Sequence, residues 1–132
     1  DDARDNFSFA VKLGYAATFL AGIFRSVRFG AASAHGRANM IRFNYFAEKG
    51  AFTRDAEGHY HVNPEAMQQA VDALSADILR LQGNGDYDGV VAFMEQYGKM
   101  TPGLEQDLAR LAAADIPVDI VFAQGKDVAG VQ

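Results

Sequence analysis

Cysteine and tryptophan are absent from this chain of 132 residues, and proline occurs only three times. Without cysteine the chain has no disulfide, thiolate metal site or cysteine nucleophile, and both a cytoplasmic and a periplasmic location stay open. Basic residues are few, 12 Lys and Arg against 17 Asp and Glu, so the net charge is −5. Proteins that hold phosphate backbones need clustered Lys and Arg, and this balance therefore argues against nucleic acid as a partner.

Long hydrophobic runs are missing too. The longest nearly apolar stretch, residues 13–24, has 12 residues, whereas a helix needs about twenty to cross a bilayer. No basic segment precedes this stretch, as would be expected of a signal peptide. We therefore predict a soluble chain with no membrane partner, and we interpret the stretch as part of a buried helix.

The motifs of common catalytic sites are also absent. The sequence contains no HExxH, HExxxH or GxSxG, no Walker A loop, and no GxGxxG that follows a strand. We predict that this chain binds no metal or other cofactor itself. If it belongs to an enzyme, we expect it to supply the walls of the site and one assisting residue, with the principal chemistry elsewhere.

What the sequence does contain is a strong helical pattern. Hydrophobic residues make up 49% of the chain and ten residues are Phe, which predicts a packed core. Apolar residues that recur every three or four positions predict about five helices. Ser33, Asn63, Asp86 and Thr101 are residue types that cap helix N-termini, and proline follows two of them at the first helical position. The predicted helices are residues 5–28, 33–49, 64–83, 86–98 and 101–114.

The remaining regular structure is small. Two β-prone runs, residues 51–54 and 59–62, flank a turn and predict a hairpin. Residues 118–122 are apolar and β-branched, which predicts a short extended segment near the C-terminus. The fold class is therefore mainly α, with about five helices, a β-hairpin near residues 51–62 and this last segment. No repeat or linker divides the chain, so residues 1–132 are predicted to form a single helical domain.

The first predicted helix carries apolar or small residues on nearly all sides between Phe7 and Phe29. A helix of that kind is normally buried on every side, but four short neighbours are too few to surround it. We therefore expect an apolar surface that stays exposed and supports self-association. The expected core stripe of this helix is Phe9, Leu13, Ala16, Leu20, Phe24 and Val27.

The second predicted helix has an unusual polar side. His35, Asn39 and Arg42 recur at steps of four and three residues and so share one stripe. Asn bonds a peptide group in both directions and Arg pairs with carbonyl or carboxylate oxygens, so the stripe is suited to holding a peptide. The alternative is an internal polar network that joins two helices. Arg37 and Asn44 point roughly the opposite way, where packing or solvent contact is expected.

His35 lies in the first turn of this helix if Ser33 is its cap. Partial positive charge at a helix N-terminus disfavours the imidazolium. A neutral imidazole can donate a hydrogen bond to a carbonyl oxygen that becomes anionic, which is the role of a polarising histidine. The alternative is a partly exposed histidine bonded to a backbone carbonyl.

Two further histidines alternate along the predicted hairpin. His59 and His61 face one side of it because side chains alternate along a strand. Two such residues can ligate zinc, but no third ligand lies at a suitable distance in the sequence. A surface hairpin commonly carries polar side chains, and this is the alternative for both.

Several short blocks between residues 28 and 52 form a combined pattern. They are Arg28-Phe29-Gly30, Ala34-His35-Gly36, Asn39, Phe43-Asn44-Tyr45 and Glu48-Lys49-Gly50-Ala51-Phe52. With these blocks the chain resembles the dipeptidyl-peptidase III family of zinc peptidases, especially its bacterial branch. The similarity continues through residues 77–79, 85–87 and 96–98 and covers roughly residues 13–122.

The resemblance implies a mechanism for the whole protein. In the family, zinc held by two His of an HExxxH-type helix and by a later Glu activates water, which attacks a peptide carbonyl. His35 matches a family histidine that contacts the substrate and helps to stabilise the tetrahedral state. Asn39 lies one turn further on, where the family places a polar or basic residue in the same cleft.

Both zinc motifs lie upstream in the family and are absent here. The resemblance therefore implies a C-terminal fragment of a peptidase whose zinc and peptide substrate belong to the parent protein, and which is inactive alone. On this interpretation His35 is the assisting catalytic residue, and His35, Asn39 and Arg42 bind substrate. The competing interpretation is a non-catalytic helical module that binds or interacts with other molecules.

Overall fold

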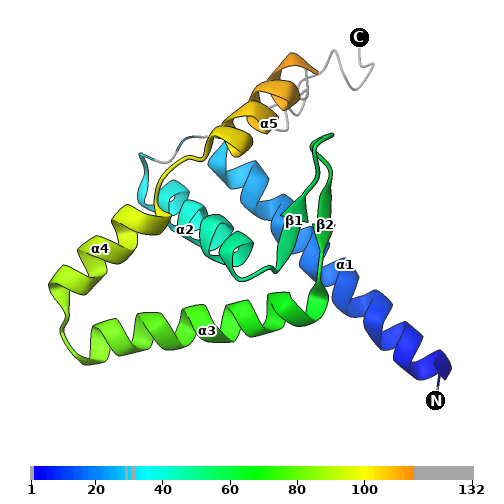
Figure 1. Cartoon of the computed structure of the whole chain (residues 1–132), viewed down its shortest axis with the longest axis horizontal. Helices are drawn as coiled ribbons and strands as arrows, with labels where there is room; N and C mark the ends of the chain where they lie inside the picture. Colours follow the sequence, from blue (N-terminus) through cyan, green and yellow to red (C-terminus); the bar gives the residue numbers. More distant parts are fainter. Residues whose placement is uncertain (1, 29, 31, 115–132) are drawn as a thin grey trace, which may run out of the picture.

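The chain is described by a computed structural model that covers residues 2–28, 30 and 32–114 (Figure 1). Its described part is mainly α with one two-stranded antiparallel sheet, which is the predicted fold class. The extended segment predicted at residues 118–122 lies outside the described residues. In chain order the elements are α1 (Asp2–Val27), α2 (Ala34–Glu48), β1 (Phe52–Arg54), β2 (Tyr60–Val62), α3 (Pro64–Gly83), α4 (Tyr87–Tyr97) and α5 (Pro102–Ala113).

The four predicted N-caps set the starts of α2 to α5. The side chains of Ser33, Asn63, Asp86 and Thr101 each accept a hydrogen bond from the backbone N–H three residues later, at 3.0, 3.1, 2.8 and 3.4 Å. Each bond satisfies one of the N–H groups that a helix leaves without an internal partner. Local sequence chemistry therefore determined these boundaries.

Helix α2 lies at the centre of the arrangement and contacts α1, α3 and α4 (Figure 1). Its inner residues Met40, Phe43, Tyr45 and Phe46 are buried. Aromatic rings extend the core on both sides of α2, since offset and edge-to-face ring pairs are favourable beyond their burial. Phe43 packs against Phe24, Phe52 and Tyr60, while Tyr45 packs against Phe93 and Tyr97.

Two tyrosine hydroxyls tie α2 to its neighbours. The Tyr45 hydroxyl donates to Asp77 on α3 at 2.7 Å, and the Tyr97 hydroxyl on α4 donates to Glu48 at 2.9 Å. Burial and the carboxylate partner raise the pKa of both phenols, that of Tyr97 to about 12. Both groups therefore stay neutral donors across the pH range in which proteins work.

The hairpin pairs Phe52 with Val62, Thr53 with His61, and Arg54 with Tyr60. An isolated two-stranded hairpin is marginal in water. This hairpin is held because Phe52 and Tyr60 pack into the aromatic core.

Helix α1 departs from the expected burial. Of the predicted stripe, Ala16, Leu20 and Val27 are buried, and Ile23 is buried as well. Phe9 and Leu13 are not: they are 48% and 37% exposed. The prediction of burial was wrong for this half because α1 extends past the hairpin and the start of α3, so that no described element covers it (Figure 1).

The same helix is the only segment of the described residues that is long and apolar enough to cross a membrane. This segment is Arg4–Val27, with a mean hydropathy of 1.5, and 17% of its most apolar window is buried inside the structure. The prediction that no segment is long enough to cross a membrane used only the apolar run 13–24. The structure extends the helix through the more polar residues on either side of that run, so the segment is longer. A long apolar helix near an N-terminus is weak evidence for a membrane span, since core helices satisfy the same criteria.

Candidate functional site

Two glycines, Gly30 and Gly36, come close together at the start of α2, next to His35. Gly30 has a φ of +91°, a conformation that glycine adopts readily. A Cβ on Gly36 would collide with the carbonyl oxygen of Gly30, so only glycine allows this close approach. His35 therefore sits in the first turn of α2, two residues after the Ser33 cap, as predicted. Its side chain is exposed, and none of its ring atoms has a hydrogen-bond partner within the described ranges.

Asn39 joins α1 to α2. Its side-chain amide donates to Ser26 Oγ at 2.6 Å and to the His35 carbonyl oxygen at 3.1 Å. Its carbonyl oxygen accepts a hydrogen bond from Arg42 Nη1 at 3.2 Å. The structure thus brings Asn39 and Arg42 together and leaves the His35 ring outside this network. This is the geometry of the helix-joining alternative for Asn39.

Arg42 keeps most of its donors because a guanidinium has five N–H groups and one is used here. It stands at the rim of an apolar hollow of about 240 Å³ between α2, α3 and α4. Ile41, Leu74 and Phe93 are among the side chains that line this hollow. The hollow is suited to a ligand that has an apolar side chain next to a carbonyl or carboxylate group. The apolar side chain would enter the hollow, and Arg42 would donate to the oxygen.

The opposite side of α2 serves packing, as expected. The Asn44 amide donates to the backbone carbonyl oxygens of Tyr97 and Lys99, both at 2.7 Å. These two bonds fix the chain at the end of α4. The stem of Arg37 lies close to Gly98 in the same region.

A buried ionic cluster links the hairpin to α5, and sequence reasoning missed it. Asp107, which is 6% exposed, accepts from Arg54 Nε and Nη2 and from the Tyr60 hydroxyl, each at 2.7 Å. Arg110 Nη1 lies 3.6 Å from the same carboxylate. The Arg54 bonds lower the pKa of Asp107, so it stays ionised. The available signal was an acidic residue between Leu104 and Leu108 on the apolar side of a predicted helix.

The two hairpin histidines meet a carboxylate at the turn. Asp55 Oδ2 lies 3.2 Å from His59 Nδ1 and 3.0 Å from His61 Nε2. Hydrogen bonds from both rings lower the pKa of Asp55 well below its usual range. Both imidazoles are exposed. Across the part of the chain that the structure describes, no group of three or more His, Asp or Glu residues has the geometry of a metal site.

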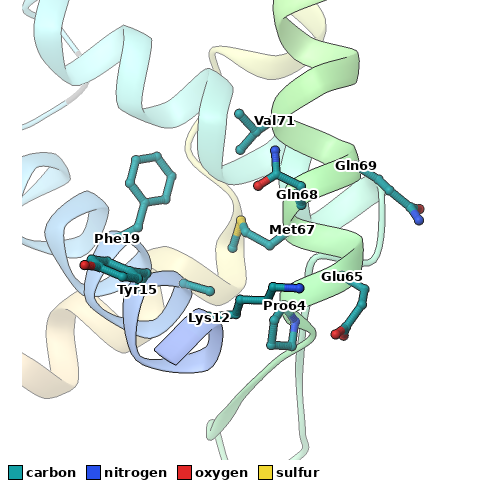
Figure 2. A pocket seen from close by; sticks show the side chains of 10 residues that line it. Lys12, Tyr15, Phe19, Pro64, Glu65, Met67, Gln68, Gln69 and Val71 are labelled. Atoms are coloured by element: carbon teal, nitrogen blue, oxygen red, sulfur yellow. The ribbon is translucent and has the colours of Figure 1, made fainter. Parts of the chain in front are cut away.

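A larger hollow lies between the outer half of α1 and the start of α3. It has a volume of about 620 Å³, and Lys12, Tyr15 and Phe19 line it from α1. Figure 2 shows the side chains of Met67 and Gln68 on α3 facing this group across the hollow, while the Lys12 side chain extends toward Pro64. The hollow is an open groove between two helices with mostly apolar walls.

Comparison with known proteins gives two relatives and no matching family model. Among curated proteins the chain is similar to Nudix hydrolase 3 of Arabidopsis thaliana, with 40% identity over 103 residues, 78% of this chain and 13% of that protein. Among solved structures it is similar to DPP III from Caldithrix abyssi. That match has a TM-score of 0.72 and 40% identity, and covers 78% of this chain and 20% of the other.

These matches support a dipeptidyl-peptidase III-like fold, since the sequence identity and the superposition refer to the same solved structure. The curated relative has a different hydrolase name. The chain spans only 13% and 20% of the lengths of these two relatives, so most of each protein lies outside the similarity.

Proposed function

We propose that this chain is the C-terminal helical part of a dipeptidyl-peptidase III-like zinc peptidase, in which it forms one wall of the substrate cleft. The observation that carries the proposal is the 40% identity and common fold with a DPP III structure over 78% of the chain. The resemblance seen in the blocks around α2 points to the same family. The Nudix name of the curated relative is compatible with it, because the match takes in only 13% of that protein.

Zinc does not fit the described residues of this chain, which offer no group able to hold a metal. In the proposed parent the metal and the activated water belong to the remaining part of the polypeptide. The contribution of this chain is to bind and orient the peptide.

His35 is the assisting residue in this proposal. Its ring is exposed in the first turn of α2, two residues after the Ser33 cap. An imidazole N–H donates to the peptide carbonyl oxygen and stabilises it as negative charge develops there. The backbone of Gly36, next to His35, lies so close to the Gly30 carbonyl oxygen that a side chain there would collide with it.

Arg42 and Asn39 bind the substrate in this proposal. Arg42 meets a carbonyl or carboxylate oxygen at the rim of the apolar hollow. Asn39 holds the guanidinium in place through their hydrogen bond, and its bond to Ser26 anchors the pair to α1.

The decisive experiment uses the complete protein encoded by the reading frame that contains this sequence. With a dipeptidyl substrate, His35→Ala is expected to lower kcat/KM by about 100-fold, the usual effect of removing one donor to a developing oxyanion. The zinc content should not change. His59→Ala is the matched control, because His59 is also exposed but lies on the hairpin. Equal activity of both variants, or a parent without peptidase activity, would contradict the proposal.

A second measurement separates binding from the structural role of Asn39. Asn39→Ala and Ser26→Ala both remove the bond between α1 and α2, but only the first removes a group proposed to support substrate binding. Asn39→Ala should raise KM more than Ser26→Ala does. If the two variants have the same KM, Asn39 serves the helix pair alone. The isolated chain with added zinc should show no turnover.

A further inference from the structure

We propose that the outer half of α1, together with the groove between α1 and α3, is the surface that docks against the metal-bearing part of the parent polypeptide. We call it the docking surface and define it by Phe9, Tyr15 and Phe19 on α1 and by the groove residue Val71 on α3. The inference rests on the proposed function for the identity of the partner, but not for the existence of the surface.

The exposure of this surface is the first argument. Tyr15 is 77% exposed, and Phe9, Phe19 and Val71 are 48%, 40% and 37% exposed. Large apolar side chains scattered singly are normal on a protein surface, but a contiguous group marks an interaction site. Here Tyr15 and Phe19, four residues apart on α1, line a groove of about 620 Å³ with mostly apolar walls. Phe9 lies next to this groove, in a hollow that it shares with Lys12 and Glu65.

The length of the relatives identifies the occupant. In both relatives a stretch 40% identical to this chain is part of a much longer protein, and the match takes in only 13% and 20% of their lengths. A segment of a larger fold has surfaces that its own core does not cover. The outer half of α1 is such a surface, and the rest of the longer fold is what covers it.

A membrane is a less suitable occupant. The outer half of the helix carries Asp5 and Lys12, and charged side chains are costly in a bilayer core. The inner half of α1 is committed to the protein core through Leu20, Ile23 and Val27, so the helix cannot span a bilayer while this fold persists.

The groove also constrains the partner chemistry. Lys12 and Glu65 stand at its walls, with apolar side chains between them. The structure therefore suits a partner segment whose apolar side chains enter the groove and whose acidic group meets Lys12.

The test compares one substitution in two contexts. In the isolated 132-residue chain Tyr15→Asp should leave Tm unchanged, because the side chain is 77% exposed. In the complete parent protein the same change should lower Tm by at least about 3 °C, since it places a carboxylate in a buried contact. Tyr87→Asp is the matched control: Tyr87 is also 77% exposed, but it lies on α4, and it should be neutral in both proteins.

A chemical measurement keeps the test decisive if Tyr15→Asp prevents the parent from folding. The chain has no cysteine, so Tyr15→Cys introduces a single thiol whose alkylation can be located by mass spectrometry. Rapid alkylation in the isolated chain and protection in the parent support the docking surface. Equal alkylation in both, or a reading frame that encodes nothing beyond this chain, overturns it.

The other occupants are measured with the isolated chain. A dimer in sedimentation that Tyr15→Asp disrupts would identify a second copy of the chain as the occupant and overturn the proposal. Flotation with anionic lipid vesicles that Tyr15→Asp abolishes would identify a membrane surface instead, and would overturn it as well. The peptidase assay of His35→Ala is independent of these readouts, so failure of the proposed function and failure of the docking surface give different results.

Discussion

Both halves of α1 carry large apolar side chains, but their surroundings are opposite. In the inner half, Leu20, Ile23 and Val27 are at most 4% exposed. In the outer half, Phe7 and Tyr15 are more than 70% exposed. Apolar periodicity therefore shows which side chains are suited to burial. Whether they are buried depends on which other elements lie next to the helix.

The largest expected effect comes from the same substitution in each half. Leu20→Ala removes a side chain that is 4% exposed and should cost about 3 kcal/mol of unfolding free energy through lost burial and a cavity. Leu13→Ala, at a position 37% exposed, should cost less than about 1 kcal/mol. Denaturant unfolding of both variants of the isolated chain measures the difference. Equal costs would mean that the outer half is packed as well as the inner one.

The second prediction moves the comparison to two carboxylates on the hairpin side of the molecule. Asp107→Asn should destabilise the chain by about 2 kcal/mol, because it leaves the buried ends of the Arg54 and Tyr60 bonds poorly satisfied. Asp55→Asn should have a clearly smaller effect, since its imidazole partners are exposed. The midpoints of urea unfolding compare the two, and a larger loss for Asp55→Asn would contradict the assignment of Asp107 as the anchor of α5.

The third prediction concerns the polar bond that holds the inner half of α1 to α2. Ser26→Ala removes the acceptor of the Asn39 amide and should cost about 1 kcal/mol. Ser8 is the natural control, since it is exposed in the outer half, and Ser8→Ala should be neutral. Thermal unfolding of the two variants gives the answer. No difference between them would show that the bond contributes nothing to the helix pair.

The smallest expected effect is in pH dependence. The pKa of Asp107 is below its usual value of 3.8 in the folded chain, so its ionic contacts stabilise the fold above that pH. This contribution is lost as pH falls through the lowered folded-state pKa. The decline of stability from pH 5 to acid conditions should therefore be shallower in Asp107→Asn than in the native chain. A steeper loss of stability on acidification in Asp107→Asn than in the native chain would contradict the prediction that ionised Asp107 stabilises the fold.

Much of the fold could be predicted because its determinants are local. Side chains that cap a helix predict where it starts, and all four predicted caps were confirmed: Ser33, Asn63, Asp86 and Thr101. The exposure of Phe9 could not be predicted, because it depends on where the other helices end in space.

The candidate site divides in the same way. The first-turn position of His35 follows from the Ser33 cap, and the structure confirms it. The Asn39 bond to Ser26 and the Asp107 contact with Arg54 join segments distant in sequence, 13 and 53 positions apart. Such pairings depend on helix crossing and hairpin placement, which periodicity does not specify. The roles proposed for His35, Asn39 and Arg42 in catalysis and substrate binding stay predictions.

Amide hydrogen exchange along α1 tests the central claim most directly, when it is measured in the isolated chain and in the complete parent protein. In the isolated chain residues 16–27 should exchange slowly and residues 4–15 quickly, because only the inner half is packed against other elements. In the parent both halves should be slow. Fast exchange of residues 4–15 in both proteins would contradict the claim that this half of the helix is a surface made to be covered.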